Sequence, residues 1–296
     1  MFLHKLYYLK FINFLSKQQD SFEIIKKLKS FFLNFIFFYR HNPFQETKKI
    51  FITKKYYIEK FSFDIFDYSH VSQLIFANYE KSHFQFYIKN FSKGEIFIDI
   101  GSNIGIHSFF VLKFLNPFRV YSIEPQPLCV NLQKKTLYNN KELAIKNRKI
   151  FIINKAINNK NKKLKIFRNN SGSGTLNNDF GNDYIEKYNQ NIIKIGYISV
   201  KKIFGYLKKD KKITIKIDTQ GSELFILQEI YKTKNLKNIK NIIFEVNKEN
   251  IEMLRIVLTK YLKEFKLINF NLEEVSLIHL RKNIKACLIL TKKDAF

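Results

Sequence analysis

Short apolar runs alternate with longer segments of helical periodicity from about residue 95 to the end of the chain. The runs that we expect to form strands cover residues 96–100, 119–123, 149–153, 213–217, 241–246, 266–270 and 286–290. The segments that we expect to form helices cover residues 104–115, 127–139, 222–231 and 249–263. Strands that alternate with helices are typical of a parallel sheet with crossover helices. The pattern therefore predicts an α/β fold, doubly wound around a mostly parallel seven-stranded sheet.

Two parts of the chain depart from this rhythm. Residues 160–205 hold short β-like pieces and turns, which makes them a candidate insertion on the substrate side. Residues 1–79 precede the alternating pattern and mix apolar with basic side chains, so we expect a helical, basic N-terminal extension or cap. The main domain then spans residues 80–296.

The apolar stretch at residues 31–39 is about half as long as the ~20 residues that a helix needs to cross a bilayer. We favour a helix that packs its aromatic side chains onto the domain, and a basic segment at a membrane surface stays open as the alternative. Lys10 and Lys17 interrupt any signal-like apolar core, and the two cysteines, Cys129 and Cys287, fit a reducing setting. We therefore expect a cytoplasmic protein, with peripheral membrane contact left open.

The net charge of +27 raises the question of a polyanionic partner such as nucleic acid. The excess is nearly all lysine and is spread along the chain, which favours a compositional bias over a focused binding patch. A hydrophobic fraction of 46% excludes a disordered chain.

A glycine turn follows the first expected strand and reads Asp99-Ile-Gly-Ser-Asn-Ile-Gly105. Its glycines let the backbone turn tightly and approach a ligand, and the next helix begins with unpaired N–H groups. A dinucleotide fingerprint would need glycine at 103 and 106, where this chain has Asn103 and Ile106. Glu124 ends the next strand, where a carboxylate can accept hydrogen bonds from both ribose hydroxyls. The candidate cofactor-binding residues are Asp99, Gly101, Ser102, Asn103, Gly105 and Glu124; two strand-end acids that only cap turns are the alternative.

Four blocks, at residues 97–108, 123–127, 215–223 and 244–246, together resemble the FkbM-type methyltransferases in order and spacing. The resemblance covers a core of about residues 97–270. It implies a Rossmann-like methyltransferase sheet, S-adenosylmethionine as cofactor, and O-methylation of a hydroxyl on a sugar, glycolipid or small metabolite. Ser102, Gln220 and Ser222 depart from the family pattern, and the change at 220 removes one carboxylate that the family often has.

Methyl transfer to a hydroxyl needs a positioned acceptor and a base for its proton. Asp218 ends the fourth expected strand, Glu223 lies about one helical turn further on, and Glu245 closes the next strand. These three carboxylates are the candidate catalytic residues, and we expect no obligatory metal. Asp218 and Glu223 also suit the capping of a helix without catalysis. His107 lies on the helix after the glycine turn, where packing is the favoured interpretation.

Two other function classes stay open. A nucleic-acid methyltransferase would fit the charge, but the chain lacks an Asn/Asp-Pro-Pro-aromatic element and a Pro-Cys nucleophile. A non-catalytic binding module that keeps the methyltransferase fold is the second, and the intact glycine turn argues against it. We therefore expect a small-molecule or glycan acceptor, and the oligomeric state stays open.

Overall fold

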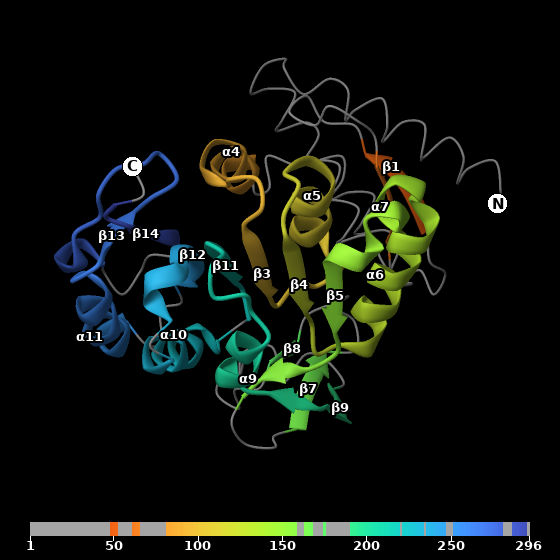
Figure 1. Cartoon of the computed structure of the whole chain (residues 1–296). Helices are drawn as coiled ribbons and strands as arrows, with labels where there is room; N and C mark the ends of the chain where they lie inside the picture. Colours follow the sequence, from red (N-terminus) through yellow and green to blue (C-terminus); the bar gives the residue numbers. More distant parts are fainter. Residues whose placement is uncertain are drawn as a thin grey trace, which may run out of the picture. The chain divides into compact units, whose positions relative to one another are not determined.

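The structure is a computed structural model of the whole chain (Figure 1). It describes residues 48–52, 61–65, 81–158, 163–167, 174–175, 190–219, 221–233, 235–246, 251–280 and 286–294. The chain divides into two compact units, residues 1–81 and 82–296.

The described part of the first unit is mainly a pair of antiparallel strands, β1 (Lys48–Ile52) and β2 (Phe61–Ile65). Both strands are rich in isoleucine and phenylalanine, which pack well on a pleated surface. The sequence predicts helix in this extension, so these two segments differ from the expectation. The apolar stretch at residues 31–39 lies outside the described residues. Within the described part of the chain, no helix is long and apolar enough to cross a membrane.

A seven-stranded sheet forms the centre of the second unit, in the order β13-β14-β12-β11-β3-β4-β5. Only β14 runs against the other strands. The strands are β3 (Ile96–Ile100), β4 (Arg119–Ile123), β5 (Ile150–Ile153), β11 (Ile213–Ile217), β12 (Ile239–Val246), β13 (Phe265–Ile268) and β14 (Ala286–Lys292). The predicted α/β fold and all seven predicted strands are confirmed, and no strand end differs from the prediction by more than two residues.

The helices that pack around this sheet include the four that the sequence predicts. They are α4 (Lys81–Asn90), α5 (Ile106–Phe114), α6 (Pro127–Asn139), α7 (Lys141–Ile145), α9 (Val200–Gly205), α10 (Glu223–Lys232) and α11 (Ile251–Tyr261). Short 3₁₀ turns cover Asn147–Lys149, Leu236–Asn238 and Leu277–His279.

The order of the strands reverses between β3 and β11. After β3 the chain adds β4 and β5 on one side, and it later returns to place β11 and β12 on the other side. Ligands of open α/β sheets bind at the carboxyl ends of the strands at such a switch point. A ligand is therefore expected at the loops that follow β3, β4 and β11.

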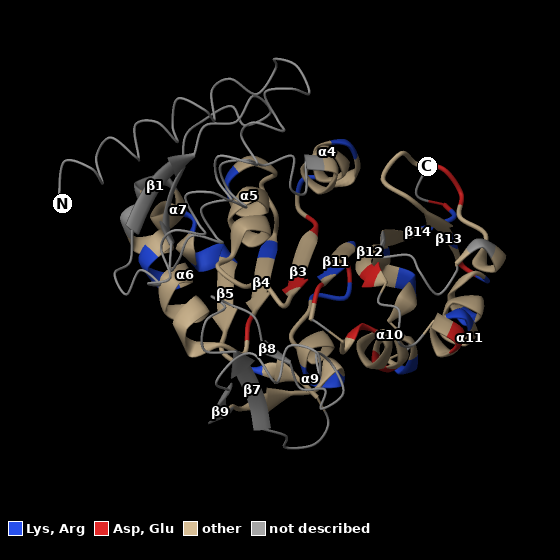
Figure 2. Ribbon diagram, turned by 180° about the vertical axis from the view of Figure 1, so that it is seen from behind, with Lys and Arg blue, Asp and Glu red and all other residues tan. Residues whose placement is uncertain are grey.

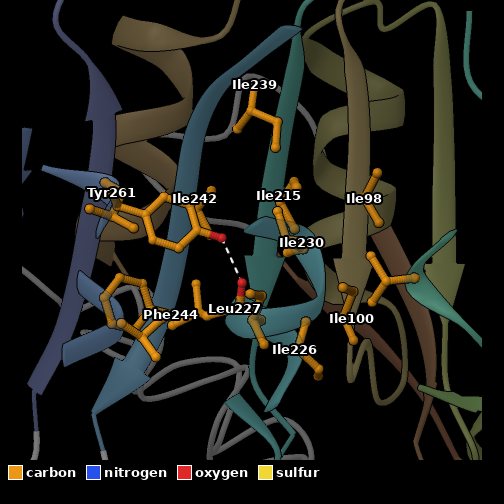
Figure 3. Packing of buried hydrophobic residues seen from close by; sticks show 14 of the residues in the cluster. Ile98, Ile100, Ile215, Ile226, Leu227, Ile230, Ile239, Ile242, Phe244 and Tyr261 are labelled. Carbon is orange, nitrogen blue, oxygen red and sulfur yellow. Dashed lines mark hydrogen bonds between the residues drawn. The ribbon is translucent and has the colours of Figure 1, made fainter. Parts of the chain in front are cut away.

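The core lies between the sheet and the helices that cover it. Every residue of β3 and β11 is buried, because these central parallel strands are covered on both faces, and most of their residues are accordingly apolar. Figure 3 shows isoleucines of the central strands packed against Ile226 and Ile230 of α10. In the same cluster the Tyr261 hydroxyl donates to the Leu227 carbonyl oxygen at 2.7 Å, which satisfies a polar group inside the core.

Two small sheets contain the described strands of the predicted insertion, and one of them also takes a strand from just before residue 160. β7 (Lys163–Phe167) pairs antiparallel with β8 (Gly174–Thr175) and β9 (Gln190–Lys194), and β6 (Ala156–Ile157) pairs with β10 (Tyr197–Ile198). Residues 171–173, which belong to the glycine-serine segment of this insertion, lie outside the described residues. In Figure 1, β7, β8 and β9 lie toward the carboxyl ends of β4 and β5. This is the side on which the sequence analysis expects substrate.

Candidate active site

The turn after β3 has a backbone that ordinary residues rarely adopt. Gly101, Asn103 and Gly105 have φ values of 77°, 52° and 85°. The N–H groups of Gly101 and Ser102 both donate to the Ile123 carbonyl oxygen, at 2.9 and 3.1 Å, so the turn is fixed to the end of β4. Glycine carries a positive φ without the steric cost of a Cβ atom, which explains its use at 101 and 105.

Gly101 is also the point where this turn meets the end of β11. A Cβ atom at position 101 would lie 1.8 Å from the backbone oxygen of Asp218. In addition, the Asp218 N–H donates to the Ile100 carbonyl oxygen at 2.9 Å. The glycine turn and the segment that carries Asp218 therefore touch through their backbones, and they form one site.

Glu124 occupies the end of β4 and is 4% exposed. Its two carboxylate oxygens accept from the N–H groups of Asn103 and Gln126, each at 2.8 Å. Burial raises the pKa of the Glu124 carboxyl to about 7, although these two hydrogen bonds act in the opposite direction. The negative charges of Asp99 and Asp218 raise this pKa further. The carboxylates of Asp99, Glu124 and Asp218 are therefore close enough to affect one another. Figure 2 shows acidic positions near the ends of β3 and β4.

A buried lysine joins two of these carboxylates. Lys216 is 4% exposed on β11, and its Nζ lies 3.2 Å from Asp218 Oδ2 and 3.8 Å from Asp99 Oδ1. Asp99 is fully buried, whereas the Asp218 side chain is 28% exposed. Lys216 is not among the site residues predicted from the sequence. The signal in the sequence is a lysine inside a mostly apolar strand at the centre of the predicted sheet, since a buried lysine needs a charged partner.

Asp99 lies behind the glycine turn. Its Oδ2 accepts from the Ser108 hydroxyl at 2.7 Å, which ties β3 to α5. Its Oδ1 is buried and has no hydrogen-bond partner, with the Lys216 ammonium as the nearby cation.

Gln133 of α6 is a second residue that the sequence analysis missed. It is completely buried, and its Nε2 donates to Ser102 Oγ at 2.9 Å and to the Asn103 carbonyl oxygen. Its Oε1 accepts from the Ser122 hydroxyl at 2.8 Å. One amide thus holds the glycine turn and β4 together. No sequence signal distinguishes it, because glutamine is an ordinary helix residue.

Glu223 and Glu245 occupy different surroundings from Asp218. The Glu223 carboxylate accepts from the Thr219 N–H at 2.7 Å, the Thr219 hydroxyl at 3.0 Å and the Gly221 N–H at 2.9 Å. It therefore stabilises the turn between β11 and α10, as the capping interpretation expects. Glu245 is partly buried near the end of β12, one residue beyond the paired Ile217 and Phe244. Gln220 lies outside the described residues.

His107 lies in the first turn of α5 and is 4% exposed. Its ring stacks on Phe84 with centroids 5.0 Å apart, and its Nδ1 lies 3.2 Å from the Tyr87 hydroxyl. The packing interpretation of this histidine agrees with these contacts. Within the described residues, no three His, Cys, Asp or Glu side chains gather in a way that would hold a metal ion.

A comparison with protein families shows which family this site belongs to. The profile of the methyltransferase FkbM domain matches residues 99–274, which begin at Asp99 and include every candidate site residue. The chain belongs to the FkbM methyltransferase family. The cofactor of this family is S-adenosylmethionine, as the resemblance implied.

Other comparisons of this FkbM chain give distant similarities. A search of the curated proteins found no match. Among solved structures, it is similar to the FkbM methyltransferase of Methylobacillus flagellatus KT, with 15% identity and a TM-score of 0.41. That match covers 68% of this chain and 44% of the other. It is also similar to an rRNA methylase of Streptococcus thermophilus, with 12% identity, a TM-score of 0.39, and coverage of 71% and 93%.

The residues of the FkbM site fit a cationic cofactor. The buried Oδ1 of Asp99 has no hydrogen-bond partner, and such an atom is costly unless a ligand or water reaches it. Gly101 lets the end of β11 come close to the turn, because a Cβ atom there would meet the Asp218 backbone. The candidate cofactor-binding residues, with Glu124 among them, surround this turn, and their acidic side chains suit the positive sulfonium and ammonium groups.

A cavity of about 350 Å³ lies elsewhere in the domain. Its lining includes Lys93, Lys212, Lys240 and Lys292, which precede β3 and β11, begin β12 and end β14. It therefore opens at the amino ends of the parallel strands, opposite the glycine turn. We assign it no part in methyl transfer.

Proposed function

We propose that this FkbM methyltransferase transfers the methyl group of S-adenosylmethionine to a hydroxyl of a sugar, glycolipid or small metabolite. The observation that carries the proposal is the position of Asp218. Its backbone oxygen touches the cofactor turn at Gly101, and its carboxylate is the partly exposed member of the three carboxylates around the site. An acceptor that enters from solvent meets this carboxylate first.

Asp218 is the base in this proposal. S-adenosylmethionine supplies, when bound, an electrophilic methyl group on a positively charged sulfur. The Asp218 carboxylate would take the proton of the acceptor hydroxyl and later pass it to solvent. Lys216 holds the carboxylate in place from the buried side, at 3.2 Å.

The other two candidate catalytic residues, Glu223 and Glu245, have supporting tasks in this proposal. Glu223 already accepts three hydrogen bonds from its own turn, so its free acceptor capacity is small. Glu245 lies beside the end of β11, where it contributes negative charge. Neither assignment requires a metal ion. Asp99, Gly101, Ser102, Asn103, Gly105 and Glu124 hold the cofactor.

The test is transfer of an isotopically labelled methyl group from S-adenosylmethionine into separate fractions of glycans, lipids, small metabolites and nucleic acids. We expect label in a hydroxyl-bearing glycan, lipid or metabolite, and a loss of turnover of about 10²-fold or more in Asp218→Asn. Asp210→Asn is the matched control, because Asp210 is exposed and lines the cavity at the opposite edge of the sheet. Label in nucleic acid, or normal turnover by Asp218→Asn with intact cofactor binding, would overturn the proposal.

A further inference from the structure

Gln126 carries a buried side-chain amide whose nitrogen has no hydrogen-bond partner among the described residues. The residue is 3% exposed, and its Nε2 has no hydrogen-bond partner. It precedes the first residue of α6, a position that often caps a helix, but its side chain makes no capping hydrogen bond. The neighbour of its Oε1 is the Cys129 thiol, at 3.8 Å. An amide donor that is buried and unsatisfied weakens the folded state, so its presence calls for an explanation.

The position of Gln126 suggests which ligand group would satisfy this donor. Its backbone N–H donates to Glu124 Oε1 at 2.8 Å, and its side-chain Oε1 accepts from the Cys129 thiol, which also lies 3.5 Å from Asn103 Oδ1 of the cofactor turn. The opposite oxygen of Glu124 accepts from the Asn103 N–H of the cofactor turn. A carboxylate recognises only donors of a ligand, such as ribose hydroxyl hydrogens. A nucleoside also presents acceptors, namely its hydroxyl oxygens and ring nitrogens, and these need a donor from the protein.

We propose that Gln126 is a cofactor-binding residue whose side-chain amide donates a hydrogen bond to the nucleoside part of S-adenosylmethionine. This inference rests on the proposed cofactor site and adds a contact to it. Glu124 accepts from the nucleoside and Gln126 donates to it, so the pair recognises both kinds of polar group. The unsatisfied amide of the ligand-free protein then becomes satisfied when the cofactor binds.

A second buried glutamine, within α6, provides the control. Gln133 is also buried, but its Nε2 donates to Ser102 Oγ and to the Asn103 carbonyl oxygen. The variants Gln126→Met and Gln133→Met remove the amide from similar surroundings at nearly constant size. We expect Gln133→Met to lower the melting temperature of the ligand-free protein. We expect Gln126→Met to leave it unchanged or to raise it, because an unsatisfied donor is removed.

Calorimetry then measures the dissociation constants of S-adenosylmethionine, S-adenosylhomocysteine and adenosine. We expect Gln126→Met to weaken all three by a similar factor of about 5 to 30, since each contains the nucleoside. A structural role for Gln126 would lower the melting temperature as well, and that result would overturn the inference. So would an unfolded variant, unchanged affinities, or a loss that spares adenosine. If the wild-type protein binds none of the three ligands, the cofactor site itself is refuted.

Discussion

The affinity for S-adenosylmethionine should fall below neutral pH, because only the ionised Glu124 carboxylate offers both of its oxygens as strong acceptors to the ribose hydroxyls. Burial raises the pKa of this carboxyl to about 7 in the ligand-free protein. Below this pH the carboxyl is protonated, and its proton has to leave before the cofactor binds. The positive charge of the cofactor then favours the ionised form, which opposes the like charges of Asp99 and Asp218.

The size of the change in affinity follows from the fraction of molecules in which Glu124 is ionised. Near pH 6 only about a tenth of the molecules are ionised, so the dissociation constant should be about 10-fold larger than near pH 8. Binding should release about 0.9 proton at pH 6 and about 0.1 proton at pH 8.

The stability of the ligand-free protein should change in the opposite direction. The pKa of Glu124 is raised from 4.5 to about 7 in the folded state, so protonation favours the fold. This stabilisation is complete below pH 4.5 and is lost as the pH rises through about 7. The loss in the free energy of unfolding is of the order of 3 kcal/mol.

Calorimetry in buffers of different ionisation enthalpy measures both the affinity and the protons released. Glu124→Gln is the control, because it cannot titrate, and the difference between the two proteins removes the titration of the ligand. A proton release that is the same in wild type and Glu124→Gln between pH 6 and 8 would refute the assignment. So would an affinity of wild type that does not change with pH.

Three further predictions concern the backbone and the core. Gly101→Ala should abolish cofactor binding in calorimetry, because its Cβ atom would lie 1.8 Å from the Asp218 oxygen; full binding would contradict the close approach. Lys216→Met should lower the free energy of unfolding by about 3 to 5 kcal/mol in chemical denaturation, because it leaves the buried Asp99 without its cation. A change below about 1 kcal/mol would show that the ion pair is not needed. Tyr261→Phe should cost about 1 kcal/mol in the same assay, since the Leu227 carbonyl oxygen loses its 2.7 Å partner, and no loss would mean that this bond is not formed.

The sheet could be predicted from the sequence because its strands are short apolar runs that alternate with segments of helical periodicity. The turn from Asp99 to Gly105 and the acid at Glu124 were also visible, since both follow directly from the ends of strands. The contacts between the turn and Glu124 depend on the register in which β3 pairs with β4. Hydrophobic periodicity predicts that these strands are neighbours, but it does not predict their register.

The rest of the candidate site could not be predicted, because it consists of contacts between distant elements. Gln133 holds the glycine turn from a different helix, and nothing in the local sequence indicates the direction of its side chain. Glu223 was a candidate base on spacing alone, but its hydrogen bonds are set by the turn at 219–221. The strands β1 and β2 belong to a segment in which apolar and basic residues alternate without a clear period, so helix and strand were hard to separate.

The buried ion pairs of Lys216 have a consequence for how the site can evolve. The lysine faces Asp99 across the β3–β11 pair and Asp218 two positions along its own strand. Loss of Lys216 leaves two negative charges without a cation, and that of Asp99 lies where water does not reach, so this substitution is selected against. Among relatives, an exchange of the lysine at position 216 should therefore be accompanied by a compensating exchange at 99 or 218.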